Sequence, residues 1–144
     1  YKGFMAAGRT ISDDRGMVLA TINDHDKEEF LDIAKEMKEL GYTFLATEGT
    51  AKTLRRNDID AVTVNKIGEG KPNILDAIMN NQVDMVINTP TKGNDAKRDG
   101  FKIRRTATEY NVDIMTSLDT LKALVKVTKK QINNHELKVY NIAE

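Results

Sequence analysis

Five short apolar segments, separated by stretches of helical composition, constrain the fold of this chain more than any other feature. They cover residues 17–22, 42–47, 61–64, 85–88 and 113–116. The first shows no polar alternation, as is typical of a strand with both faces buried. Strands that alternate with helices through short connections form parallel sheets covered by helices on both sides. The sequence therefore predicts an α/β domain with a doubly wound, open, five-stranded parallel sheet of flavodoxin-like type.

Helices are expected between these strands. They are predicted over residues 27–40, 51–57, 99–110 and 117–132. A further helix is predicted to begin near residue 73. In the first helix, apolar residues recur every three or four positions, as on one face of an amphipathic helix, and Gly41 ends it. Three segments lack such a pattern and are interpreted separately. Residues 1–16 are expected to be a linker from a preceding domain, so that the domain itself comprises residues 17–144. Residues 91–98 are expected to form a mobile cationic loop, and residues 137–142 an edge strand or a loose tail.

Polar residues follow three of the predicted strands. Thr47-Glu48-Gly49-Thr50 lies between a strand and a helix, where Gly49 would allow a sharp turn and the hydroxyls and free amides could donate to an anion. Val64-Asn65-Lys66 and Asn88-Thr89-Pro90 end two further strands. Ligands of doubly wound sheets bind at the carboxyl ends of the strands. We therefore expect these groups to surround one polar pocket for a phosphorylated small molecule.

Each motif also has an ordinary structural interpretation. Thr50 alone is expected to be the N-cap of its helix, and Pro90 could simply end a strand. The basic pair Arg104-Arg105 could reach the ligand, but adjacent helical residues point about 100° apart, so at most one faces the pocket. A solvated face, or an ion pair with Asp99 or Glu109, explains this pair equally well.

Composition narrows the classes of function. The 144 residues amount to one ordinary domain, and 22 basic residues balance 22 acidic ones, so no global field favours nucleic acid or an anionic membrane. No apolar run approaches the roughly 20 residues that span a bilayer, and no signal peptide is visible. Without cysteine there is no disulfide or thiolate chemistry, and no histidine–carboxylate cluster has metal-ligand spacing. We predict no metal site and a cytoplasmic location.

Six segments in order carry a resemblance to a known family. They are Asp26-Lys27-Glu28, Ala46-Thr47-Glu48-Gly49-Thr50-Ala51, Val64-Asn65-Lys66, Lys71-Pro72-Asn73-Ile74, Val86-Ile87-Asn88-Thr89 and Asp99-Gly100-Phe101-Lys102-Ile103-Arg104-Arg105. Their succession resembles the carboxyl-terminal allosteric domain of the carbamoyl phosphate synthase large chain, a member of the methylglyoxal synthase-like superfamily. The resemblance covers the chain from Met17 onward, and residues 1–8 are similar to the joint with the preceding domain.

The resemblance implies a non-catalytic regulatory module that binds a nucleoside monophosphate, UMP or IMP, with ornithine at a neighbouring site in some members. Together with the phosphate motif, it predicts the effector site at Lys27, Thr47, Gly49, Thr50, Lys66, Asn88, Thr89 and Thr91. Lys66 and Thr50 would bind phosphate, and Asn88 the ribose or base. Lys27 would be a second cation on the phosphate or an exposed charge. Pro90 departs from the small polar residue of many relatives, so Thr89 or Thr91 would substitute there, or the effector preference would differ.

The resemblance also sets expectations for the parent protein. Such enzymes make carbamoyl phosphate from bicarbonate, glutamine-derived ammonia and ATP, for arginine and pyrimidine synthesis. ATP and Mg or Mn would belong to catalytic domains upstream in the same chain, and no cofactor is expected in this domain. The expected partners are the nucleotide effector, those upstream domains and the glutaminase small chain, with self-association into a homo-oligomer left open.

Three alternatives remain. Methylglyoxal synthase itself needs an aspartate in a Gly-Gly-Asp loop and a histidine near the phosphate, whereas here Lys71 stands near the expected aspartate. The histidines, His25 and His135, are expected to be solvated. The cyclohydrolase domain of purine synthesis has a similar strand-Thr-Gly-Gly-Thr-helix start, but Glu48 replaces a glycine. The third alternative is an interaction domain with an empty pocket.

Overall fold

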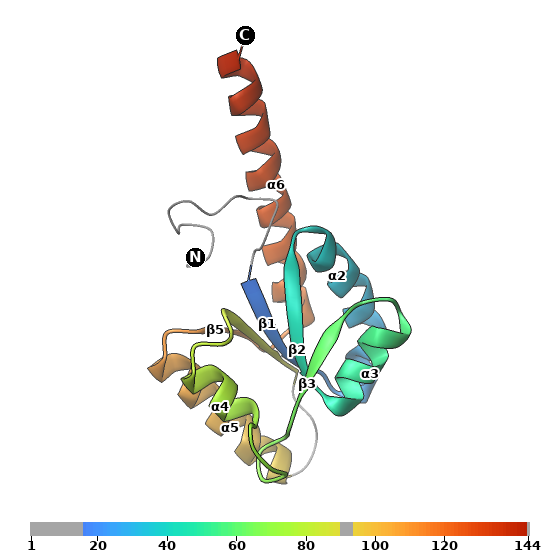
Figure 1. The fold of residues 1–144 in the computed structure, drawn as a ribbon, viewed down its shortest axis with the longest axis vertical. Coiled ribbons are helices and arrows are strands. Elements are labelled where there is room, and N and C mark those ends of the chain that lie inside the picture. Colours follow the sequence, from blue (N-terminus) through green and yellow to red (C-terminus); the bar gives the residue numbers. More distant parts are fainter. Residues whose placement is uncertain (1–15, 90–93, 144) are drawn as a thin grey trace.

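A parallel sheet forms the centre of the molecule. The computed structural model describes residues 16–89 and 94–143, with only the backbone for 94–96 and 135–143. The strands are β1 (Gly16–Thr21), β2 (Tyr42–Thr47), β3 (Ala61–Val64), β4 (Met85–Asn88) and β5 (Asp113–Met115). All neighbouring pairs are parallel and the order is β3-β2-β1-β4-β5 (Figure 1). The predicted doubly wound five-stranded sheet is confirmed.

Helices cover both faces of this sheet. One face carries α2 (Lys27–Glu39), α3 (Glu48–Arg56) and α6 (Leu118–Ala143), and the other carries α4 (Ile74–Met79) and α5 (Asn94–Glu109). The central strand explains the two cores, because Val18 and Ala20 are buried against the first layer and Leu19 against the second. Such alternation within an uninterrupted apolar strand is what burial on both faces requires.

The helix after β2 begins earlier than expected, at Glu48 rather than at residue 51. Thr47 is its N-cap residue, with φ −66° and ψ 158° and no capping hydrogen bond from its side chain. The expectation that Thr50 caps this helix is therefore wrong, because Thr50 already lies in the first turn. Gly49 is helical as well, so it does not make the sharp turn that we predicted. The chain turns at Thr47, in extended backbone that any residue adopts.

Two other segments are more helical than the sequence suggested. Helix α5 begins at Asn94, so residues 94–98 are not the loop that we expected, and residues 90–93, with Thr91, lie outside the described residues. No glycine or proline interrupts 94–99, and Asp95 suits the positive end of a helix dipole. Helix α6 continues to Ala143, so the predicted strand or tail at 137–142 is wrong. No helix-breaking residue follows Ser117, and α6 extends past the sheet (Figure 1).

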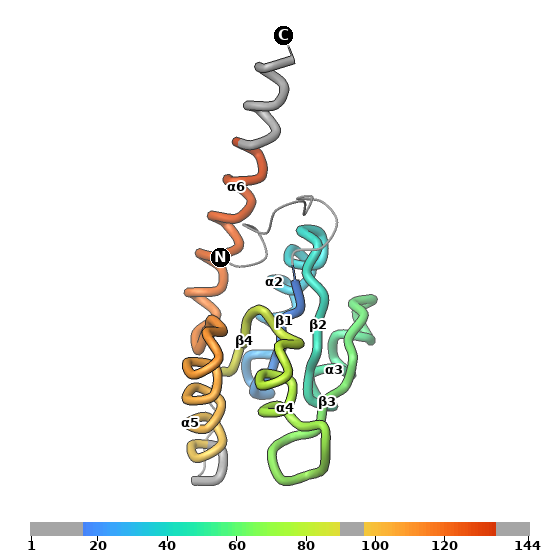
Figure 2. Tube along the Cα trace, turned by 60° about the vertical axis from the view of Figure 1, so that its left-hand side comes forward, coloured from blue at the N-terminus to red at the C-terminus, as the bar shows by residue number. Residues whose placement is uncertain are grey.

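The carboxyl ends of the strands meet at one end of the molecule. The connection after β3 and the first turns of α5 lie at that same end (Figure 2). A short 3-10 turn, η1 (Asp24–Asp26), joins β1 to α2 there. The side chain of Asn23 caps it by accepting from the amide of Asp26 at 2.8 Å. The site residues are thus brought together by the winding of the chain rather than by closeness in sequence.

Candidate functional site

One cavity of about 340 Å³ lies at the carboxyl edge of the sheet. It is lined by the ends of β1, β2 and β4, the starts of α2 and α3, the connection from β3 to α4, and α5. Its lining residues are Thr21, Ile22, Asn23, Asp24, Lys27, Thr47, Gly49, Thr50, Lys66, Ile67, Ile74, Asn88, Thr89, Asp99, Gly100 and Ile103. All the predicted effector-site residues except Thr91 line this cavity, and Thr91 is outside the described residues.

The strand register brings the polar groups of β1 and β4 together. Thr21 pairs with Asn88 across the sheet, and its Oγ1 donates to Oδ1 of Asn88 at 2.5 Å. With that oxygen engaged, the amide nitrogen Nδ2 of Asn88 faces Gly100, where an added Cβ would lie 3.6 Å away. Thr89, directly after β4, is tied to the segment after β1, since its Oγ1 accepts from the amide of Asn23 at 2.8 Å. Asn88 therefore offers a donor to the cavity in an orientation that Thr21 holds.

Thr50 has a structural role that the sequence did not reveal. The residue is only 2% exposed. Its Oγ1 accepts from the amide of Ile22 at 3.3 Å and lies 3.5 Å from the carbonyl oxygen of Ile22, to which it donates. The hydroxyl thus joins the first turn of α3 to the end of β1. A phosphate bound by the Thr50 hydroxyl would compete with this contact, whereas the backbone amides of the α3 terminus carry no such constraint.

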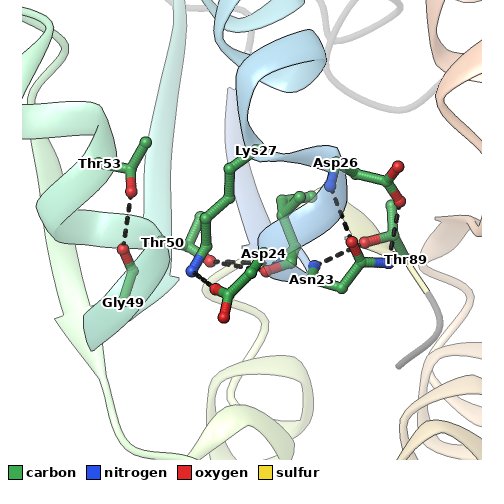
Figure 3. A network of polar contacts seen from close by, with 9 residues as sticks. Asn23, Asp24, Asp26, Lys27, Gly49, Thr50, Thr53 and Thr89 are labelled. Carbon is green, nitrogen blue, oxygen red and sulfur yellow. Dashed lines mark hydrogen bonds and ion pairs between the residues drawn. The ribbon is translucent and has the colours of Figure 1, made fainter. Parts of the chain in front are cut away.

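Lysine side chains place positive charge beside the start of α3. The side chain of Lys27, 20% exposed, forms an ion pair through Nζ with Oδ1 of Asp24, whose side chain is 96% exposed (Figure 3). A Cβ added to Gly49 would lie 3.2 Å from that Nζ. The missing side chain of Gly49 therefore makes room for the ammonium group over the helix terminus.

The acidic residue Asp24 responds to both lysines. The hydrogen bond and the charge of Lys27 hold the pKa of the Asp24 carboxyl below its ordinary value. Desolvation opposes this shift, and the charge of Lys66 adds to it least. Lys66 and Gly49 also line a second hollow, between α3 and the loop after β3. Lys66 therefore stands where a ligand in either hollow would meet its charge.

Several lining residues were not among the predicted site. Asp24 and Thr21 lie beside the end of β1, a position that topology alone could have pointed to. The apolar wall of Ile67, Ile74 and Ile103 gave no signal, because buried isoleucines occur throughout any core.

The basic pair on α5 is also placed. Arg105 forms an ion pair with Glu109, with 3.3 Å between Nε and Oε1. Nη1 of Arg104 lies 3.7 Å from the position of a Cβ on Gly100, beside the cavity. The expectation that at most one of the two faces the pocket is consistent with this arrangement.

The fold and this cavity define a class of protein. A model of the MGS-like domain family matches residues 29–116, and the chain belongs to that family. It is 56% identical over 142 residues to a carbamoyl phosphate synthase large chain of Clostridium perfringens (strain 13 / Type A), covering 99% of this chain and 13% of the relative. It is 53% identical over 143 residues to that of Clostridium botulinum (strain Loch Maree / Type A3), with the same coverage. The match to Clostridium beijerinckii (strain ATCC 51743 / NCIMB 8052) is 51% over 145 residues, which is 14% of that relative.

These matches fall in the carboxyl-terminal region of the large chains, which are ligases. The chain spans about an eighth of the length of these relatives. The predicted resemblance to the carboxyl-terminal domain of such a large chain is confirmed. Within the described residues no helix is long and apolar enough to cross a membrane, and no three histidine or carboxylate side chains gather as for a metal ion.

Proposed function

We propose that this domain is the effector-binding domain of a carbamoyl phosphate synthase large chain and that its cavity binds a nucleoside monophosphate. The observation that carries the proposal is that one cavity combines a cationic end, at Lys27, Lys66 and the start of α3, with isoleucine side chains in its lining. A volume of about 340 Å³ lies within the range of small-ligand sites.

The phosphate belongs at the cationic end. Both lysines can form charge-assisted contacts with its oxygens, and the unpaired amides of the first turn of α3 can donate to it. Gly49 keeps that terminus open, since no Cβ covers the backbone there. Thr50 contributes its amide to the phosphate, while its hydroxyl keeps the contact with Ile22.

The nucleoside belongs at the other end. Nδ2 of Asn88 and the hydroxyl of Thr89 can donate to ribose or base oxygens. The isoleucine wall offers a flat base an apolar surface to pack against. In the parent enzyme, binding here would modulate carbamoyl phosphate synthesis, with ATP and its metal in upstream domains and the glutaminase small chain as partner. Ornithine would act from a neighbouring site.

Methylglyoxal synthase chemistry is the weaker candidate. Among the described residues no histidine lines the cavity, and His25 is exposed on η1. The histidine that this chemistry uses for proton transfer near the phosphate is therefore missing from the described lining of the cavity.

Thermal unfolding in the presence of UMP, IMP and ornithine tests the proposal. A ligand at 100 times its Kd stabilises the folded state by about 2.7 kcal/mol, which for a domain of this size raises Tm by roughly 5 to 10 °C. Lys66→Met should remove most of that shift by deleting a countercharge. Lys35→Met, an exposed lysine of α2 outside the cavity, is the matched control and should keep the shift. Millimolar UMP and IMP that leave the Tm of the wild-type domain unmoved would refute the nucleotide site.

A further inference from the structure

The cationic end of the cavity contains a carboxylate. Asp24 lies on η1 and its carboxylate is bound by Nζ of Lys27, the ammonium group that sits over Gly49. Figure 3 shows the two side chains meeting in front of the first turn of α3. A carboxylate is an anion, so it already binds the ammonium group of Lys27 that a phosphate at this helix terminus would need.

We propose that Asp24 is an internal counterion of Lys27 that an incoming phosphate must displace, and that it thereby sets the affinity of the site for anions. The inference rests on the proposed phosphate position. Asp24 contributes no contact to the ligand, and acts on binding through Lys27. By holding Lys27, it lowers the affinity of the site for phosphate.

The geometry makes this displacement feasible. The side chain of Asp24 is 96% exposed, so it can turn into water without breaking any core packing. The carboxylate therefore loses little by leaving the ion pair, because water solvates it well. The cap of η1 does not depend on this carboxylate either, since Asn23 and Asp26 form it between themselves. The switch of partner therefore leaves the β1–α2 connection intact.

The counterion Asp24 affects whether a nucleotide or inorganic phosphate occupies the site. The cost of releasing Lys27 and of approaching Asp24 weakens every phosphate compound, whatever else that compound carries. A nucleotide adds contacts at Asn88 and at the apolar wall, and these contacts offset the cost. Inorganic phosphate has no such contacts, so Asp24 keeps it from filling the site at concentrations where the nucleotide binds.

Calorimetric titration of Asp24→Asn with UMP and with inorganic phosphate tests the proposal. We expect both to bind about three- to tenfold more tightly than to the wild type at low ionic strength, with a smaller gain at high salt. Asp60→Asn is the matched control, because it removes the same charge from an exposed residue before β3, at the opposite edge of the sheet. Its affinities should equal those of the wild type. Equal or weaker binding by Asp24→Asn would overturn the inference.

Two further measurements separate this role from a merely structural one. In a Lys27→Met background, Asp24→Asn should change phosphate affinity much less, because the competed partner is gone. In the wild type, saturating phosphate should raise the pKa of Asp24, followed by NMR of its carboxyl carbon, since Lys27 is withdrawn and negative charge is added. An unchanged pKa would count against displacement. Tighter phosphate binding by Asp24→Asn without any UMP binding would support the counterion and refute the nucleotide proposal alone, whereas no binding of either ligand would refute both.

Discussion

Gly49→Ala should make the domain more stable and its phosphate site weaker. Gly49 lies in the first turn of α3, where alanine restricts the unfolded chain more and favours the helix by up to about 1 kcal/mol. Apart from the neighbouring residues and backbone of α3 itself, the only described atom within 4 Å of the added Cβ is Nζ of Lys27, at 3.2 Å. That atom ends a flexible side chain, so it can move by a few tenths of an ångström at little cost. We therefore expect a gain of roughly 0.5–1 kcal/mol in unfolding free energy and a rise in Tm of about 1–4 °C.

The same methyl group should weaken phosphate binding. It displaces the ammonium of Lys27 and covers the helix terminus where the oxygens would sit. Losing one charge-assisted contact costs about 1.5–3 kcal/mol, which is roughly a ten- to hundredfold rise in Kd. Differential scanning calorimetry gives the stability and isothermal titration with inorganic phosphate gives the Kd.

Gly100→Ala provides the contrast. Gly100 is helical too, and its added Cβ would make ordinary contacts of 3.6 Å with Nδ2 of Asn88 and 3.7 Å with Nη1 of Arg104. This variant should gain stability and keep its affinity for inorganic phosphate. Wild-type phosphate affinity in Gly49→Ala would refute the placement of phosphate at the α3 terminus, and a loss of stability would refute the packing argument.

Four further outcomes follow from the same structure. Gly16→Ala should destabilise the fold by about 1–3 kcal/mol in urea unfolding, because φ is +131° and the new Cβ would lie 2.5 Å from Oδ2 of Asp84. Thr50→Val should cost about 1–3 kcal/mol, because it leaves the buried amide of Ile22, just after β1, without its partner, as thermal unfolding would show. Lys27→Met should raise the pKa of Asp24, measured by NMR titration. Finally, the purified domain should form no methylglyoxal from dihydroxyacetone phosphate in a colorimetric assay.

Each of these has a control or a contrary result. Gly68→Ala also has a positive φ, of +87°, but open space around its Cβ, so it should cost less than Gly16→Ala. Thr50→Ser should retain most of the stability that valine loses, since it keeps the hydroxyl. The direction in which the Asp24 ion pair makes stability depend on pH follows from the lowered pKa of Asp24. Its ion pair stabilises the fold at neutral pH and loses this effect as pH falls through the folded pKa, so Lys27→Met should flatten stability in that acidic range. Methylglyoxal formation above a boiled control would contradict the non-catalytic assignment.

Periodicity and topology together determined most of the architecture from the sequence. The uninterrupted apolar run of β1 and the amphipathic spacing of α2 identified a sheet buried on both faces. Parallel winding requires the ends of β1, β2 and β4 to meet, and this topology alone predicts that Thr47 and Asn88 lie beside one cavity, as they do. These inferences succeeded because they depend on backbone geometry, which local sequence patterns report directly.

Only the tertiary structure decided which atoms of these residues are available. Thr50 looked like a phosphate donor, yet its hydroxyl is bound to Ile22, a residue 28 positions away. Gly49 looked like a turn residue, yet it is helical and lies beside the ammonium of Lys27, which comes from another helix. Asp24 forms an ion pair with that same lysine. Hydrogen bonds, close approaches and ion pairs between segments distant in sequence depend on three-dimensional register and side-chain reach, and a linear pattern carries neither.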